Sequence, residues 1–216
     1  MRDAPKLTFC RRPVGVTASI GTRQLEELNV GAIELNRDDL AHLLRAAWRI
    51  SSIPEIFVLG SQSILAWIDA DALPLEVTRS VEADLAFADD PDGLAADFID
   101  GAIGELSMFH EQFGYYAQGV TLSSAVLPRG WENRAVIYRF GDIGEARALC
   151  LEPHDLSVAK LVAGREKDYE FVAALLRKGL LKGETLRSRA RLLPLRSADS
   201  EAVLTRIQTS ERMSST

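Results

Sequence analysis

Glu55-Ile-Phe-Val-Leu-Gly60-Ser61 is the stretch of sequence that decides the fold. Its apolar run followed by glycine is typical of a buried strand that ends in a turn. The apolar spacing after the glycine predicts a helix over residues 61–68. A helix that begins directly after a strand leaves its first backbone amides free, and such amides can bind phosphate oxygens. The stretch therefore predicts a turn that could hold a phosphate, to which the Ser61 hydroxyl would add a hydrogen bond.

A second strand follows, with two acids on one face. Ser80-Val-Glu-Ala-Asp-Leu-Ala-Phe87 alternates polar and apolar residues, so Glu82 and Asp84 should point to the same side. Paired carboxylates can bind one or two Mg²⁺ ions, which would bridge a nucleoside triphosphate and activate a hydroxyl for in-line attack. Such a pair is also common on the solvated face of an edge strand. Residues 69–78, which are rich in acids and contain proline, are expected to form a loop.

The rest of the chain indicates an α+β protein. Asn36 followed by acids predicts the start of a helix, which Ser51-Ser-Ile-Pro54 would end. Residues 1–35 are expected to be irregular with a short strand, and the serine-rich end, residues 210–216, is expected to be frayed. Further helices are predicted over residues 94–103, 155–164, 167–178, 184–193 and 200–207. Further strands are predicted over residues 115–126, 133–140 and 146–151.

This order predicts a mixed β-sheet core with helices, followed by a helical segment. The core would cover residues 1–152 and the C-terminal helical segment residues 153–216. The boundary is soft, and the two parts could equally form one domain.

The amino-acid composition limits the classes of protein to which the chain can belong. Of 216 residues, 47% are apolar and 26% are charged, which is typical of a globular chain and excludes disorder. Charges interrupt every apolar run of spanning length, so no membrane helix is expected. The N-terminus leads into no apolar signal segment. Cys10 and Cys150 lie far apart with no pairing framework, which favours a reducing compartment, and we expect a cytoplasmic protein.

Charge is distributed unevenly along the chain. Residues 1–159 carry 13 Lys and Arg against 24 Asp and Glu, whereas residues 160–191 carry nine against four. An acidic body with one basic helical segment can hold a metal in one part and a polyanion in the other. The plain alternative is a set of amphipathic helices with solvated basic faces.

Three segments, in the right order along the chain, resemble a known family. The order strand, Gly60-Ser61, helix, and a strand with Glu82-x-Asp84 resembles the nucleotidyltransferase fold shared by DNA polymerase β and many small transferases. The stretch from Leu151 to Val172 is similar to the Lys-x4-Arg-x2-Asp segment of the AbiEii-type toxin nucleotidyltransferases and their uncharacterised bacterial relatives. Ser80-x-Glu82-Ala-Asp84 and Gly130-Trp131-x2-Arg134 fit that branch too. The resemblance spans residues 55–180.

The resemblance implies a role for each matching residue. Gly60 and Ser61 would hold the triphosphate, and Glu82 and Asp84 would bind the metal. In the helical half, Lys160 would contact phosphate, Arg165 would add a second cation, and Asp168 matches an acid that the toxin branch needs for activity. Five residues of regular helix would turn Lys160 and Arg165 apart by roughly 140°. Arg165 is therefore expected beyond the end of the helix, after Gly164.

The activity implied is the Mg²⁺-dependent transfer of a nucleoside monophosphate from an NTP to an acceptor. By resemblance the acceptor could be tRNA or another RNA. The setting would be a toxin–antitoxin or phage-defence system, with a cognate antitoxin as a protein partner. The cofactor would be Mg²⁺ of the two-metal type.

Three features depart from the family pattern. Glu82 stands where the first metal acid is normally Asp, and the spacing from Ser61 to Glu82 is long. No third metal acid is evident, and Glu152 is the best candidate for it. These departures favour an alternative, a catalytically silent module of the same fold that binds a nucleotide, RNA or a partner protein.

Histidines and aromatic residues offer weaker candidates. His42, His110 and His154 show no zinc spacing, and only His110 could be considered as a general base. Three aromatic residues could stack a base but are more simply core residues: Tyr115, Tyr116 and Trp131.

Overall fold

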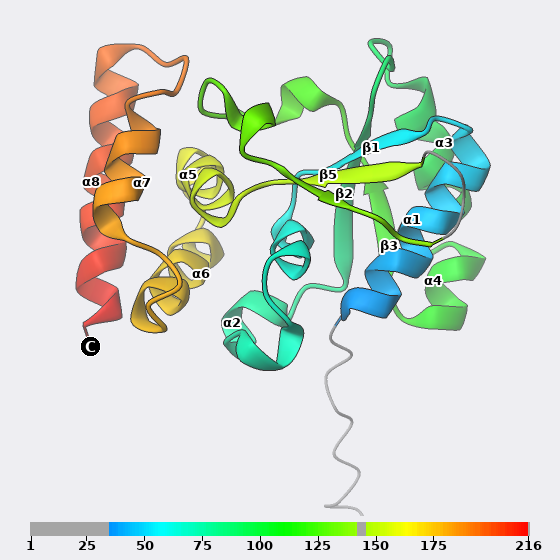
Figure 1. Ribbon diagram of the computed structural model, residues 1–216, viewed down its shortest axis with the longest axis horizontal. Coiled ribbons are helices and arrows are strands. Elements are labelled where there is room, and N and C mark those ends of the chain that lie inside the picture. The colour runs from blue at the N-terminus through cyan, green and yellow to red at the C-terminus, as the bar shows by residue number, and fades with distance from the viewer. Residues whose placement is uncertain (1–34, 142–145, 216) are drawn as a thin grey trace, which may run out of the picture. The chain divides into compact units, whose positions relative to one another are not determined.

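The computed structural model describes residues 35–141 and 146–215, which fall within one compact unit (Figure 1). Its strands are β1 (Glu55–Val58), β2 (Glu82–Phe87), β3 (Tyr116–Gly119), β4 (Val136–Tyr138) and β5 (Arg147–Cys150). Its α-helices are α1 (Arg37–Ser51), α2 (Leu75–Thr78), α3 (Leu94–Ile103), α4 (Met108–Phe113), α5 (Pro153–Ala163), α6 (Glu166–Arg177), α7 (Gly183–Ala190) and α8 (Ser197–Ser214). Four short 3₁₀ helices are η1 (Ser61–Ala66), η2 (Ala70–Ala72), η3 (Leu122–Ser124) and η4 (Trp131–Asn133). The predicted α+β class is confirmed.

The five strands form one mixed sheet in the order β3-β2-β1-β5-β4. The central strand β1 runs antiparallel to β2 and parallel to β5, with Val58 opposite both Leu85 and Cys150. On the outer sides, β2 pairs parallel with β3, and β5 pairs antiparallel with β4. The buried apolar strand predicted from residue 55 is therefore the centre of the sheet, where both of its faces are covered.

The segment after β1 differs from the prediction. Residues 61–66 form a 3₁₀ helix rather than an α-helix, and residues 62–65 are buried. The buried Gln62 amide donates to the backbone carbonyl of Ser80, at the start of the next strand. This bond ties the short helix to β2, and a tight 3₁₀ turn is common in short connectors. The loop predicted over residues 69–78 is also wrong, because it contains η2 and α2.

Other boundaries are confirmed or corrected. Asn36 caps α1 as predicted, since its side chain accepts hydrogen bonds from the amides of Asp38 (2.8 Å) and Asp39 (3.0 Å). The strands predicted over residues 115–126 and 133–140 are much shorter, as β3 and β4. The helix α4 was not predicted. Residues 210–216 were expected to be frayed, but α8 continues to Ser214. The prediction for residues 1–34 lies outside the described residues.

The helical half packs directly on the sheet half. In Figure 1, α1, α3 and α4 lie on one side of the strands and α5 to α8 on the other. α5 contacts η1, and α6 contacts both α2 and α8. A buried ionic cluster spans residue 152: the fully buried Asp155 on α5 binds Arg134 at 2.7 Å and Arg189 on α7 at 3.1 Å. Both sides of the predicted boundary thus share one core. Among the described helices, none is long and apolar enough to cross a membrane.

Candidate active site

Gly60, just beyond the end of β1, lies against Asp84 in the first half of β2. The Leu59 amide donates to the Asp84 carbonyl at 3.0 Å, which extends the pairing of the two strands. A Cβ atom at Gly60 would lie 1.7 Å from Oδ2 of Asp84. The φ angle of Gly60 is −86°, an ordinary value, so glycine is needed here for close approach and not for its backbone freedom. The predicted turn at Gly60 therefore lies directly against the Asp84 carboxylate.

Glu82 and Asp84 share one face of β2, as predicted. Both are partly exposed, and the intervening Ala83 and the following Leu85 are buried on the other face. Burial and the neighbouring Glu82 carboxylate raise the pKa of Asp84 to about 6. Tyr116 on β3 donates its hydroxyl hydrogen to Oε2 of Glu82 at 3.0 Å. The two acids thus form an electrostatically crowded pair.

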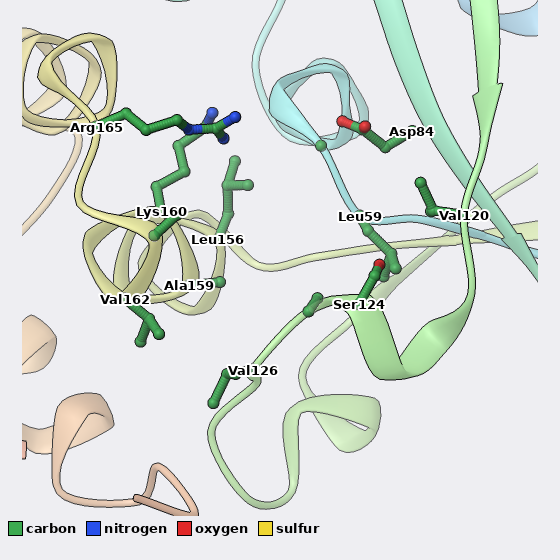
Figure 2. A pocket seen from close by; sticks show the side chains of 13 residues that line it. Leu59, Asp84, Val120, Ser124, Val126, Leu156, Ala159, Lys160, Val162 and Arg165 are labelled. Atoms are coloured by element: carbon green, nitrogen blue, oxygen red, sulfur yellow. The ribbon is translucent and has the colours of Figure 1, made fainter. Parts of the chain in front are cut away.

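Two cations face Asp84 from the helical half. α5 ends at Gly164, whose φ of 67° is left-handed, and Arg165 then caps α6. This break turns Arg165 back beside Lys160, as the rotation argument required. Figure 2 shows both side chains on the α5 and α6 side of the pocket, with Asp84 on the opposite side.

Asp168 holds the two cations in place. Its carboxylate is fully buried, and its Oδ2 accepts hydrogen bonds from the backbone amide (3.1 Å) and Nε (3.0 Å) of Arg165. Its other oxygen, Oδ1, lies 3.6 Å from Nζ of Lys160. Asp168, predicted to be catalytic, is thus fully buried and contacts both Lys160 and Arg165.

Lys160 joins the helical half to the strand-to-helix turn. Its ammonium group donates to Oγ of Ser61 at 3.2 Å and lies 4.5 Å from the ring centre of Phe171. Burial lowers the pKa of Lys160, although Asp168 and Asp84 act in the opposite direction. A cation over an aromatic face is stabilised when partly desolvated. The ammonium is thereby fixed next to Ser61.

These residues surround two neighbouring cavities. The first, of about 200 Å³, has a polar side and an apolar side, lined by Leu59, Gly60, Asp84, Val120, Ser124, Ala125, Val126, Leu156, Ala159, Lys160, Val162, Ala163 and Arg165. The second, of about 280 Å³, is lined by Ser61, Glu76, Val77, Arg79, Ser80, Lys160, Lys167 and Phe171. Lys160 borders both cavities. The structure thus brings Gly60, Ser61, Asp84, Lys160 and Arg165 together, and Glu82 lies at the edge of the group.

Other sequence candidates lie elsewhere. Glu152, considered as a third metal acid, caps α5 instead: its Oε2 accepts from the amides of His154 (3.1 Å) and Asp155 (3.2 Å). Tyr115 is hydrogen-bonded to His42, and Trp131 packs against Phe57. Neither aromatic residue lines the two cavities. Over residues 35–141 and 146–215, no group of three His, Cys, Asp or Glu is placed to hold a metal.

Sequence reasoning missed the apolar wall of the site and one ion pair that lies outside it. The apolar wall comes from Val120 to Val126 and from one face of α5, and apolar residues at helical spacing look the same whether they line a cavity or a core. Arg134 was noted only for its motif, and it binds Asp155 through two nitrogens, at 2.7 and 3.1 Å. The signal in the sequence that could have found Arg134 is an arginine shortly after the turn at Gly130.

Comparisons with protein-family models, with curated proteins and with solved structures each gave no match for this chain.

Proposed function

We propose that the protein is a nucleotidyltransferase that moves a nucleoside monophosphate from an NTP to an acceptor. One observation carries the proposal: Gly60 and Asp84 on one side and Lys160 and Arg165 on the other line the same cavity. These residues come from three segments that lie far apart in the sequence. The negative charge of Asp84 faces the positive charges of Lys160 and Arg165. A site with this arrangement suits a ligand that is anionic in one part and apolar in another, as an NTP is.

Each residue has a task in binding such a ligand. Lys160 and Arg165 neutralise phosphate oxygens, and Ser61 beside Lys160 supplies a hydroxyl. Asp168 is a positioning residue, because it holds both cations from behind. The apolar wall formed by Val126, Leu156 and the rest of that side of the cavity contacts the nucleoside. The cavity places no charged side chain on that wall, so selection of the base would depend on shape.

The acid pair fits one Mg²⁺ ion. Mg²⁺ is usually held by one or two carboxylates, with phosphate oxygens and water completing its shell. The raised pKa of Asp84 reflects burial and repulsion from Glu82, and a divalent cation would relieve that repulsion. When bound, the ion would neutralise phosphate charge as the bond to the leaving pyrophosphate breaks. A second ion would need ligands beyond these two acids.

The proposed acceptor is RNA, such as tRNA, and the proposed setting is a toxin–antitoxin or phage-defence system. Lys167 and Arg79 line the second cavity, where they could meet a phosphate backbone. Part of the basic segment is engaged within the fold, because Arg187 pairs with Glu211 at 2.7 Å and Arg189 with Asp155. Exposed cations remain at Lys167, Lys178 and Arg191.

The test is transfer from each α-labelled NTP, with Mg²⁺, into total bacterial RNA and into the protein itself. We expect label in RNA that disappears in Asp84→Ala. Asp97→Ala, an exposed acid on α3, is the control and should keep full transfer. Label that persists in Asp84→Ala would refute the metal assignment, and label in the protein alone would refute the RNA acceptor.

A silent binding module is the second candidate. The hydrogen bond from Tyr116 engages Glu82, and Glu82 does not line the cavity that Asp84 lines. Under this alternative an NTP raises the melting temperature, Mg²⁺ adds nothing and no product forms. Stabilisation of RT ln(1 + [L]/Kd) makes such binding measurable without turnover.

A further inference from the structure

A second surface of the molecule exposes apolar side chains. Leu94 and Phe98 on α3, with Leu106 and Met108 after it, are here called the α3–α4 surface. Their exposed fractions are 62%, 68%, 90% and 80%. Single exposed apolar residues are ordinary, but such residues gathered on consecutive elements mark contact sites. Leu94 and Phe98 lie one turn apart on the same exposed face of α3.

The buried face of α3 is already fully used within the fold. Ala95, Ala96, Ile99 and Ile103 are buried, and α3 packs on β3 and α1. The approach to β3 is so close that a Cβ atom at Gly119 would lie 2.0 Å from the Ala96 carbonyl oxygen. Because this opposite face is packed, α3 cannot turn to bury Leu94 and Phe98 within the described residues.

Two hydrogen bonds tie the loop that carries Leu106 to α4. The backbone amide of Leu106 donates to Nδ1 of His110 at 3.1 Å, and Ser107 caps α4 by accepting from the amide of His110. Leu106 has a left-handed φ of 62°, which L-residues rarely adopt. The most exposed large apolar side chain among the described residues thus lies on a loop that is hydrogen-bonded to α4.

The charge of this region is strongly one-sided. Residues 80–128 contain nine Asp and Glu and no Lys or Arg. Asp97, Asp100, Glu105 and Glu111 are exposed on or beside α3 and α4. The negative charge of this region repels nucleic acids and anionic membranes and attracts a basic partner.

We propose that the α3–α4 surface binds a basic amphipathic segment of a partner protein. The apolar face of that segment packs on Leu94, Phe98, Leu106 and Met108, and its Lys and Arg side chains pair with the surrounding acids. An amphipathic helix is recognised in this way by its apolar face, and the charges around the contact give specificity.

The surface borders the proposed active site. A cavity of about 360 Å³ is lined by Asp100 and Glu105 together with Glu82, Tyr116 and Gln118. The ring of His110 lies 4.6 Å from that of Tyr116, which hydrogen-bonds Glu82. A bound segment would therefore lie next to Glu82. The docking proposal does not depend on nucleotidyl transfer, and its test measures binding alone.

The test uses a fluorescent designed helix with leucine on one face and lysine on the other, and a matched peptide with glutamate in place of lysine. We expect the full chain to bind the lysine peptide, more weakly as salt is added, and to ignore the glutamate peptide. Phe98→Ser with Leu106→Ser should weaken binding at least about tenfold. The control Leu75→Ser with Ile137→Ser, which changes side chains that are 61% and 51% exposed elsewhere, should not.

A charge-reversal pair gives an independent arm. Asp97→Lys with Glu105→Lys should weaken the lysine peptide and admit the glutamate peptide, with an unchanged thermal melt. Absence of binding to the wild-type chain, or equal weakening by the Leu75 and Ile137 control, would overturn the proposal. The proposal would also be overturned if the wild type sedimented as a dimer and the Phe98→Ser, Leu106→Ser variant as a monomer. A second copy of the chain would then cover the surface.

Discussion

Asp84 is the residue on which the site depends, and its environment opposes its charge. Burial and Glu82 raise its pKa to about 6, above the ordinary value of 3.8. When folding raises the pKa of an acid, the protonated acid stabilises the folded state at pH values below its pKa in the unfolded state. This stability is lost as the pH rises through the pKa that the acid has in the folded state. The ionised Asp84 therefore costs stability at neutral pH, as is typical of functional groups.

Asp84→Asn should accordingly stabilise the metal-free protein at pH 7. The gain should be up to about 3 kcal/mol, the equivalent of the two-unit pKa shift, and should vanish at about pH 3, below the unfolded pKa. Urea unfolding at the two pH values in EDTA measures it. Mg²⁺ should then stabilise the wild type and leave the variant unchanged. A variant that is less stable than the wild type at both pH values would contradict the electrostatic account.

Gly60→Ala tests the contact between the turn and the acid. The added methyl group would occupy the position of Oδ2 of Asp84, and the carboxylate would have to turn away. Because the partly exposed carboxylate can turn, the loss of stability should be modest, about 1 to 3 kcal/mol. The loss of transfer should be large. Gly101→Ala on α3, where a Cβ meets nothing within 4 Å, is the control and should be neutral or stabilising.

The junction between α5 and α6 is the element that assembles the cation pair. Without the left-handed Gly164, Lys160 and Arg165 would lie on different faces of one helix. Gly164→Ala would introduce both an unfavourable φ and a Cβ atom 2.6 Å from the Arg206 guanidinium. We expect a loss of stability of more than about 1 kcal/mol together with a fall in transfer, measured by thermal unfolding and by the labelled-NTP assay.

Gly179→Ala provides the matched control for this element. Gly179 has a similar φ of 71°, but a Cβ atom there meets nothing within 4 Å. It should lose about 1 kcal/mol from the backbone alone and keep its activity. Equal effects of the two substitutions on transfer would show that the junction does not position Lys160 and Arg165.

Sequence patterns predicted the presence of helices and strands better than they predicted the lengths of these elements. The helix at Asn36 and the two acids of β2 could be predicted because caps and alternation are local signals. The 3₁₀ form of residues 61–66 could not be predicted from local signals, and the hydrogen bond from Gln62 to Ser80 that accompanies it joins residues 18 apart in the sequence. The contacts of Asp168 with Lys160 and Arg165 also stayed hidden, because they depend on the bend at Gly164. The apolar wall of the cavity had no separate signal at all.

At the scale of the whole molecule, the two halves should unfold together. Asp155 is fully buried between Arg134 and Arg189, and so links the sheet half to α5 and α7. All three tryptophans precede residue 152, whereas helices α5 to α8 follow it. Tryptophan fluorescence and far-ultraviolet circular dichroism should therefore report one coincident urea transition. Two separate midpoints would indicate independent domains.

Removing the central acid of that link should be costly. Asp155→Ala leaves two partly buried arginines without their carboxylate, and breaking a buried ion pair costs about 3 to 5 kcal/mol. Asp97→Ala, an exposed acid, should change stability little. Urea midpoints of the two variants give the comparison, and similar midpoints would show that the ionic cluster does not hold the halves together.

The central claim is that the cavity between Asp84 and the Lys160–Arg165 pair binds a nucleoside triphosphate with Mg²⁺. Isothermal titration of the full chain with non-hydrolysable analogues of the four NTPs, with and without Mg²⁺, tests it most directly. We predict saturable binding that Mg²⁺ strengthens in the wild type and in Asp97→Asn, and that Asp84→Asn makes independent of Mg²⁺. No binding of any analogue in the presence of Mg²⁺, or an identical Mg²⁺ response in Asp84→Asn, would contradict the account.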